Sequence, residues 1–454
     1  MKVVIVGAGE VGFHIASRLA LENKNVVVID RDPEAVRRVT DNIDAQVITG
    51  SGGSPVCLEE AGIKEAEILL AVTDSDETNL ASCLIANIIS PSTKKLARIR
   101  DADFDHFHDE IRNNAPHIDT IINPEIEVVK TIDRLMRFPG AVDVGEFAGG
   151  RVKFVGISLD KSTSIAGVRL ADLPAEIGRQ RLLIAAILRG DTLIIPHGDD
   201  VLMAGDIIYF ISKEEQLFDI LEIFDKHAQP MNRVIIIGGG RIGFRLATLL
   251  EERSVHLKII EKDADQCAHL ADKLNKAVVI HGDGSSQELL REENIQEMDM
   301  VLTLTNDEES NILTSLLVKQ MGVKNTITRI NKFSYFPLMS TIGLLQIVSP
   351  RLSAINSILQ HIRRGKVLSA ISIKGEQAEV MEAEALETSG IVGKPLRKIS
   401  FPKRALVTAI IRKDDIIIPS GDSVIEPHDR IIIFAQRHDV PKIEKILAVK
   451  LEYF

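Results

Sequence analysis

The sequence predicts an α/β protein that is a tandem duplication of a two-part unit. Each unit is a Rossmann-like domain with a doubly wound parallel sheet, followed by a small α+β domain. Three observations predict this fold class. Short apolar runs alternate with amphipathic helical stretches, a glycine-rich loop follows the first apolar run of each half, and the two halves repeat each other in the same order.

Composition and charge exclude several classes of protein. The chain has 454 residues, of which 45% are hydrophobic and 26% charged, so wholesale disorder is excluded. A net charge of −11 and an aromatic content of 4% argue against a broadly basic nucleic-acid binder and against a stacking platform for single strands. No apolar run approaches the roughly 20 residues that cross a bilayer. The three cysteines, Cys57, Cys83 and Cys267, form no CxxC motif, which favours a reducing cytosol.

The repeat extends over both parts of each half. Val3–Gly12 (VVIVGAGEVG) matches Val234–Gly243 (VIIIGGGRIG). In the second parts, the segment that begins at Ile184 (IAAILRGDTLIIPHGDD) matches the one that begins at Val407 (VTAIIRKDDIIIPSGDS), and both contain Pro-x-Gly-Asp. Chance similarity would not keep this order over both parts, so we predict that one two-part unit occurs twice.

The first part of each half is predicted to form a parallel sheet. Near-continuous Val, Ile and Leu runs indicate strands that are buried on both faces, and the helical stretches between them predict right-handed crossovers. In the first half these runs include Val3–Val6, Val26–Ile29, Val47–Ile48, Ile68–Val72 and Leu96–Ile99.

A helix with Pro at its start and Gly beyond its end joins the two parts of each half. The apolar stripe of each helix is expected to pack either against the core of its own two-part unit or against another unit. The β-rich second part then begins with a predicted hairpin around Phe147–Arg151. The predicted domains are 1–123 and 232–349 (Rossmann-like, nucleotide-binding), 124–141 and 350–366 (crossover helices), and 142–228 and 367–454 (small α+β domains).

The glycine loops indicate nucleotide binding. In a GxGxxG loop between a strand and a helix, the glycines permit a tight turn, close approach of the backbone to phosphate, and close helix packing. The helix N-terminus offers free N–H groups to an anion. Asp30 and Glu261 end the second strands, where a carboxylate can bind ribose hydroxyls. The alternative is a glycine turn that is kept for packing alone. The loop residues are Gly7, Ala8, Gly9, Glu10, Val11 and Gly12, and Gly238, Gly239, Gly240, Arg241, Ile242 and Gly243.

The two loops differ at one informative position, which is Glu10 in the first and Arg241 in the second. A cation beside phosphates favours a more highly charged group, whereas a glutamate gives no such help. We hypothesise that the first site prefers a dinucleotide and that the second accepts adenine nucleotides more readily. The alternative is that both side chains simply point to solvent.

Polar residues end the fourth and fifth predicted strands. Thr73 and Asp74 lie at the carboxyl edge of the sheet, where doubly wound folds bind ligands, although Asp74, Ser75 or Asp76 also suits helix capping. Arg98 ends the fifth strand, where it either contacts a phosphate or forms a structural ion pair. The equivalents in the second half are Thr305, Asn306 and Arg329.

No metal site is predicted. His106 and His108, which are flanked by aspartates, have no counterpart in the second half and are interpreted as a solvated loop. Asp199 and Asp422 could hold a small ion but are interpreted as turn residues.

The second parts favour a regulatory protein over an enzyme. A dehydrogenase would pair one dinucleotide domain with a substrate domain that supplies a proton-transfer group. Here the second parts show no Ser/His/Asp or Cys/His arrangement. Their duplication suggests a symmetric assembly in which ligand binding shifts the conformational equilibrium. The alternatives are an NAD(P)-dependent oxidoreductase and a nucleotide sensor for another target.

The two glycine loops, the acids at Asp30 and Glu261 and the two β-rich parts resemble the regulator-of-potassium-conductance (RCK) family over essentially the whole chain. The resemblance is to the tandem members, the peripheral TrkA subunits of bacterial Trk-type potassium uptake systems. It implies a non-enzymatic cytoplasmic subunit at the inner face of the plasma membrane. It further implies a ring-shaped homo-oligomer, expected to be a tetramer, which gates a membrane-embedded Trk-type transporter in response to NAD(H) and ATP/ADP.

The resemblance also implies which residues contact the nucleotide. They are Gly7–Val11, Asp30, Arg31, Thr73, Asp74 and Arg98 in the first half, and Gly238–Ile242, Glu261, Thr305, Asn306 and Arg329 in the second.

Overall fold

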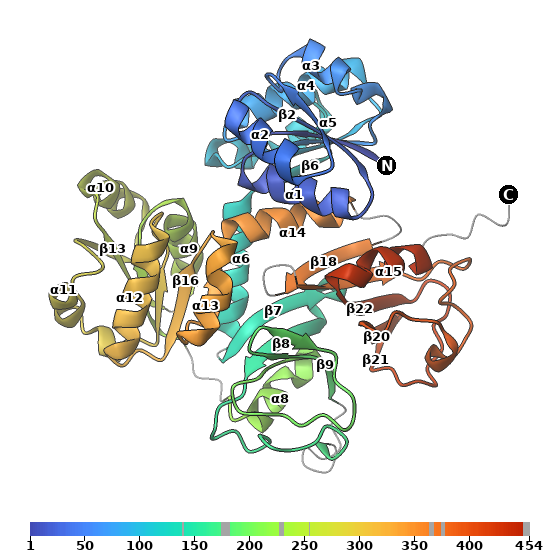
Figure 1. The fold of residues 1–454 in the computed structure, drawn as a ribbon. Helices are drawn as coiled ribbons and strands as arrows, with labels where there is room; N and C mark the ends of the chain where they lie inside the picture. The colour runs from blue at the N-terminus through green and yellow to red at the C-terminus, as the bar shows by residue number, and fades with distance from the viewer. Residues whose placement is uncertain are drawn as a thin grey trace. The chain divides into compact units, whose positions relative to one another are not determined.

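The fold is described from a computed structural model. The described residues are 1–138, 140–173, 182–226, 231–253, 255–362, 367–373 and 377–447. They divide into two compact units. The first contains residues 1–127 together with the helix at 350–362, and the second contains the remainder (Figure 1).

The first unit is built on a six-stranded parallel sheet of order β3-β2-β1-β4-β5-β6. The central strands are fully buried, as their unbroken apolar runs predict. The strands are β1 (Lys2–Val6), β2 (Asn25–Asp30), β3 (Gln46–Thr49), β4 (Ile68–Ala71), β5 (Lys94–Arg98) and β6 (Thr120–Ile122). The helices are α1 (Glu10–Leu21), α2 (Pro33–Asn42), α3 (Pro55–Glu60), α4 (Asp76–Ile89) and α5 (His108–Asn113), with short 3₁₀ turns at η1 (Ile63–Glu65) and η2 (Ala102–Phe107).

The second Rossmann-like domain repeats this topology in the order β14-β13-β12-β15-β16-β17, again all parallel. Its strands are β12 (Arg233–Ile237), β13 (His256–Glu261), β14 (Val278–His281), β15 (Met300–Thr303), β16 (Asn325–Arg329) and β17 (Gln346–Val348). Its helices are α9 (Arg241–Glu251), α10 (Ala264–Lys273), α11 (Gln287–Glu292), α12 (Glu308–Gln320) and α13 (Phe336–Thr341), with η5 (Ile295–Glu297) and η6 (Phe333–Tyr335).

The small α+β domains are five-stranded antiparallel sheets with equivalent strand orders, β7-β8-β11-β9-β10 and β18-β19-β22-β20-β21. The first contains β7 (Ala141–Phe147), η3 (Ala148–Gly150), β8 (Val152–Ser158), β9 (Leu183–Arg189), β10 (Thr192–Ile194), β11 (Ile207–Lys213), η4 (Glu214–Gln216) and α8 (Leu217–Ile223). The second contains β18 (Val367–Ile373), β19 (Ala378–Glu384), η7 (Leu396–Lys398), β20 (Ala405–Arg412), β21 (Asp415–Ile417), β22 (Arg430–Gln436), η8 (Arg437–Asp439) and α15 (Val440–Leu447).

One apolar core joins the two small sheets. Its centre is a stack of aromatic rings, in which Phe154 lies 5.7 Å from Tyr209 and 6.1 Å from Phe434 of the other sheet, measured between ring centroids. The predicted duplicated fold, with its parallel Rossmann-like sheets and small α+β domains, is therefore confirmed. The predicted hairpin around Phe147–Arg151 is also present, since β7 and β8 pair antiparallel across η3.

The crossover helices are α6 (Pro124–Arg137) and α14 (Pro350–Ile362), and the structure shows which domain each of them packs against. α14 follows the second Rossmann-like domain in sequence but packs against α1 of the first. The greater part of α6 lies in the core of the second unit together with α9, and Asp133 of α6 forms an ion pair of 2.5 Å with Arg253. Each helix therefore packs on the Rossmann-like domain of the other half.

The backbone around His106 and His108 is helical (η2 and α5) rather than a loop, and their side chains lie outside the described residues. Throughout the described chain, no helix combines the length and the apolar character that a membrane crossing requires.

Candidate functional site

The first glycine loop joins β1 to α1 and is shaped by two steric constraints. Gly7 has φ +106°, and a Cβ there would lie 2.9 Å from the backbone nitrogen of Thr73. A Cβ at Gly12 would lie 1.8 Å from the carbonyl oxygen of Gly7. Gly9 differs, because a Cβ there would meet nothing within 4 Å. Gly7 and Gly12 are therefore required by the fold, whereas Gly9 borders open space at the N-terminus of α1.

The second loop, between β12 and α9, has the same geometry. Gly238 has φ +107°, and its Cβ would lie 2.9 Å from the Thr305 nitrogen. A Cβ at Gly243 would lie 2.1 Å from the Gly238 oxygen, and Gly240 again has nothing within 4 Å. Gly9 and Gly240 are the N-cap residues of their helices and have no side chain that could accept a hydrogen bond from the first N–H groups. These N–H groups therefore point toward the open space. Both loops fit a phosphate-bearing ligand.

The predicted acids are held beside the loops. Oδ2 of Asp30 accepts a hydrogen bond of 2.5 Å from the Ala8 nitrogen, and Oδ1 accepts one of 2.9 Å from Asp32. Oε2 of Glu261 likewise accepts from the Gly239 nitrogen at 2.6 Å. Each carboxylate keeps further lone pairs that hydroxyl donors can reach. Arg31, the residue after Asp30, is exposed.

A buried asparagine that the sequence reasoning missed organises the opposite side of each site. The side chain of Asn79 accepts a hydrogen bond from the Thr73 nitrogen (2.9 Å) and donates to the carbonyl oxygens of Thr73 (3.1 Å) and Arg98 (2.8 Å). Asn311 makes the same three bonds in the second domain, at 3.0, 3.0 and 3.1 Å. The asparagine shared by TDSDETNL and TNDEESNI was the available signal.

Arg98 forms the structural ion pair that was one of its two interpretations. Nη2 lies 2.7 Å from Oδ1 of Asp74 and donates to the Thr73 carbonyl at 2.7 Å. Burial and the neighbouring Arg100 lower the pKa of Arg98, which the contact with Asp74 partly offsets. The capping residue of α4 is Ser75, which accepts from the Thr78 nitrogen at 3.0 Å.

The second domain keeps this arrangement with Asn306 in place of Asp74. Nη1 of Arg329 donates to Oδ1 of Asn306 at 2.9 Å and to the Leu304 carbonyl at 3.3 Å. The residues at the ends of the fourth and fifth strands therefore come together in both domains, because parallel neighbouring strands end at the same edge of the sheet. Whether the arginines also contact a phosphate stays a prediction.

Glu10 does not simply point to solvent. Its Oε1 lies 2.6 Å from Nη1 of Arg38, and its Oε2 lies 3.1 Å from Nη1 of Arg351. Burial raises the pKa of Glu10, but the hydrogen bond from Arg38 and the charge of Arg351 outweigh it, so the pKa is lowered overall. Arg241 occupies the equivalent position of α9 and is exposed.

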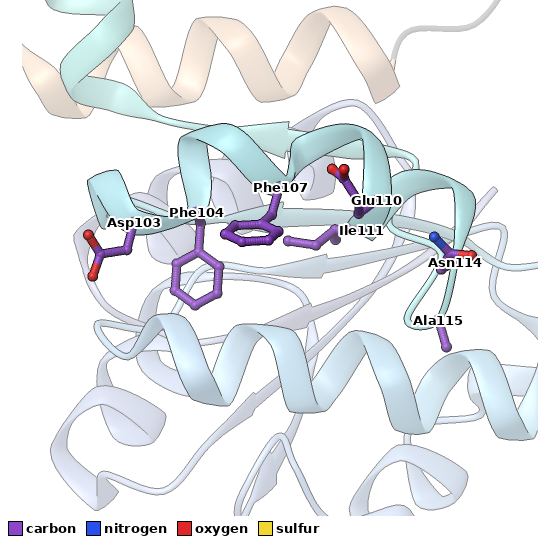
Figure 2. Close-up of a pocket in the computed structure, with 7 residues that line it drawn as sticks. All are labelled: Asp103, Phe104, Phe107, Glu110, Ile111, Asn114 and Ala115. Atoms are coloured by element: carbon purple, nitrogen blue, oxygen red, sulfur yellow. The ribbon is translucent and has the colours of Figure 1, made fainter.

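A separate cavity of about 420 Å³ lies along η2 and α5, and no predicted site residue lines it. Figure 2 shows the side chains of Phe104, Phe107 and Ile111 near one another among the residues that line this cavity. Phe104 and Ile111 also pack against the core of the first domain, whereas Phe107 is 56% exposed. The remaining lining residues are Asp103, Glu110, Asn114 and Ala115.

Comparison with known proteins matches both parts of both halves. The family model of the TrkA-N domain matches residues 3–124 and 234–350. The family model of the TrkA-C domain matches residues 154–225 and 380–448. These are the Rossmann-like and the small α+β domains, in the order in which the chain repeats them.

Curated relatives match over the full length. The Trk system potassium uptake protein TrkA homolog 2 of Methanosarcina mazei is 38% identical, covering 98% of this chain and 100% of the relative. The Trk system potassium uptake protein TrkA of Azorhizobium caulinodans is 35% identical, covering 100% of both chains.

Solved structures share the fold. The GsuK RCK domain matches with a TM-score of 0.60 at 18% identity, covering 98% of this chain and 94% of that chain. The GsuK channel bound to NAD matches with a TM-score of 0.60 at 18% identity, covering 98% of this chain and 78% of that chain. With both domain models matched twice and relatives aligned end to end, the chain belongs to the TrkA family, with tandem RCK units.

Proposed function

We propose that the protein is a cytoplasmic regulatory subunit of a Trk-type potassium uptake system and that it gates potassium uptake in response to NAD(H) and ATP/ADP. The observation that carries this proposal is the duplicated glycine loop. Each loop leaves open space at its middle glycine and places an acid, Asp30 or Glu261, beside the loop. The names of the full-length relatives support the potassium uptake system, and a similar structure is described as bound to NAD.

The small α+β domains support regulation over catalysis. In a dehydrogenase the second domain would present proton-transfer groups to a substrate beside the cofactor. Here the two small domains bury their sheets against each other through Phe154, Tyr209 and Phe434. The domains are thus used to join the two halves, which suits a device that transmits a change of shape.

The mechanism that we propose is a population shift. A nucleotide can gate ion flow only if it binds the open and closed arrangements of the assembly with different affinity. The ion pathway belongs to a membrane-embedded Trk-type partner, and this subunit acts from the inner face of the plasma membrane.

Potassium uptake into vesicles that contain the purified Trk-type membrane subunit tests the proposal. We expect adding the protein to change uptake, and NADH, ADP and ATP to shift it by at least about fivefold between the most and least active states, which is the lower range of allosteric coupling. Uptake that ignores both protein and nucleotide would contradict regulation. Consumption of NADH with a small substrate would instead favour the oxidoreductase.

We further propose that exposed apolar side chains on α4 of the first domain and on α12 and α13 of the second join copies of the chain into a ring, expected to be a tetramer. In the first domain Leu84 and Ile88 of α4 are 41% and 71% exposed. In the second, Leu313 of α12 and Leu338 of α13 are 66% and 50% exposed. Exposed apolar residues of this kind on the surface helices of both domains are typical of association surfaces.

The assembly proposal predicts that Ile88→Asp dissociates the oligomer, because a carboxylate cannot be buried unpaired at an apolar interface. Analytical ultracentrifugation at micromolar protein should show species smaller than those of the parent. Val56→Asp is the matched control, since Val56 is 72% exposed but lies on α3. Identical sedimentation of both variants and the parent would contradict the assignment of α4 to the interface.

A further inference from the structure

Glu10 lies between two guanidinium groups at the start of α1. One belongs to Arg38 on α2, 2.6 Å from Oε1, and the other to Arg351 in the first turn of α14, 3.1 Å from Oε2. His14 lies on the same face of α1, with Nε2 at 3.8 Å from Oε2. The carboxylate of Glu10 therefore contacts two permanent cations at once.

Arg38 is held in place by contacts other than Glu10, and Arg351 is largely buried. Nη2 of Arg38 donates to the carbonyl oxygen of Ala8 at 2.8 Å, and its Cζ lies 4.6 Å above the ring of Phe13. The side chain of Arg351 is only 21% exposed. Because Ala8 belongs to the glycine loop, the guanidinium pair lies beside the loop whose open space borders Gly9. A pair of fixed arginines suits a phosphate group that carries more than one charge.

The second site has the opposite arrangement at the loop. The position of Glu10 is Arg241, so the loop contributes a cation there instead of an anion. The position of Arg38 is His269, whose ring packs against Phe244 with 5.8 Å between centroids. Gln266 takes over the hydrogen bond to the loop, since its Nε2 donates to the Gly239 carbonyl at 2.7 Å.

We propose, on the basis of the proposed nucleotide-binding function, that Glu10 is an internal anion that competes with the terminal phosphate of ADP or ATP for Arg38 and Arg351. A terminal phosphate monoester carries a charge of about −1.5 to −2. It must displace Glu10 to bind the arginine pair. The pyrophosphate of NAD(H) is a diester with one charge on each phosphate, and it binds chiefly to the loop N–H groups. Glu10 therefore selects the dinucleotide at the first site.

The test uses the full chain with the second site blocked by Gly240→Leu, in which the new side chain fills the open space beside that loop. Isothermal calorimetry then reports the first site alone, with its stoichiometry as a check. Adding Glu10→Gln should raise the affinity for ATP about tenfold or more, the scale of one charge-assisted hydrogen bond, while the affinity for NADH changes less than about twofold. Adding Arg351→Gln as well should abolish the gain.

The matched control is Glu34→Gln, which changes the net charge equally from the exposed first turn of α2. Equal gains for ATP and NADH, or the same gain with Glu34→Gln, would overturn the inference, because bulk charge would then explain the effect. Unchanged ATP affinity in Glu10→Gln would also overturn it. If neither nucleotide binds to the Gly240→Leu parent, the proposed function itself fails at this site, and the inference fails with it.

Discussion

Gly9→Leu should abolish nucleotide binding at the first site without unfolding the domain, and Gly12→Ala should strongly destabilise the domain. At Gly9 a Cβ would have no protein atom within 4 Å, so a side chain there extends into the space that a phosphate would need. At Gly12 even a methyl group would lie 1.8 Å from the Gly7 carbonyl oxygen, which is backbone and cannot move aside. We expect a loss of about 3 kcal/mol or more in the free energy of unfolding.

Calorimetry with NADH and urea unfolding distinguish the two variants. Gly53→Ala is the control, because its Cβ would make only ordinary contacts of 3.8 Å with Ala81 and with Oγ of Ser51. It should keep both binding and stability. A Gly9→Leu protein that binds NADH at the first site as tightly as the parent would contradict the assignment of the loop. A Gly12→Ala protein of normal stability would contradict the steric argument.

Asn79→Leu should destabilise the first Rossmann-like domain by about 3 kcal/mol or more. Leucine has a similar volume but leaves the Thr73 nitrogen and the Arg98 carbonyl without their partner inside the protein. Each buried group left unpaired costs about 1–3 kcal/mol. Because Asn79 links the ends of β4 and β5 at this edge of the site, nucleotide affinity should fall as well.

Hydrogen exchange measures this effect within a multidomain chain, because it reports β4 and β5 separately from the second domain. Protection in these strands should fall, whereas β15 and β16 should not change. Asn42→Leu is the control, since Asn42 is exposed and makes one bond, from Nδ2 to the Arg38 carbonyl at 2.8 Å. Equal protection in the two variants would show that the Asn79 network is not a stabilising element.

The strands and the glycine loops could be predicted because their signals are local. An unbroken run such as Val3–Val6 indicates a strand that is covered on both faces. A glycine between a strand and a helix is needed wherever φ is positive, as at Gly7. The role of Asn79 was missed because a polar residue in the first turns of a helix usually faces solvent. Only the positions of Thr73 and the Arg98 carbonyl show that its side chain points inward.

The sequence by itself determined the duplicated fold, the two loops and the acids beside them, because each depends on residues that are neighbours along the chain. The tertiary structure decided which domain each crossover helix packs against and which cations surround Glu10. An apolar stripe and an unpaired charge show only that a partner is needed. Hydrophobic burial is non-directional, and ion pairing depends on distance in space. Arg351 could therefore be identified as a partner of Glu10 only once α14 was seen to pack against α1.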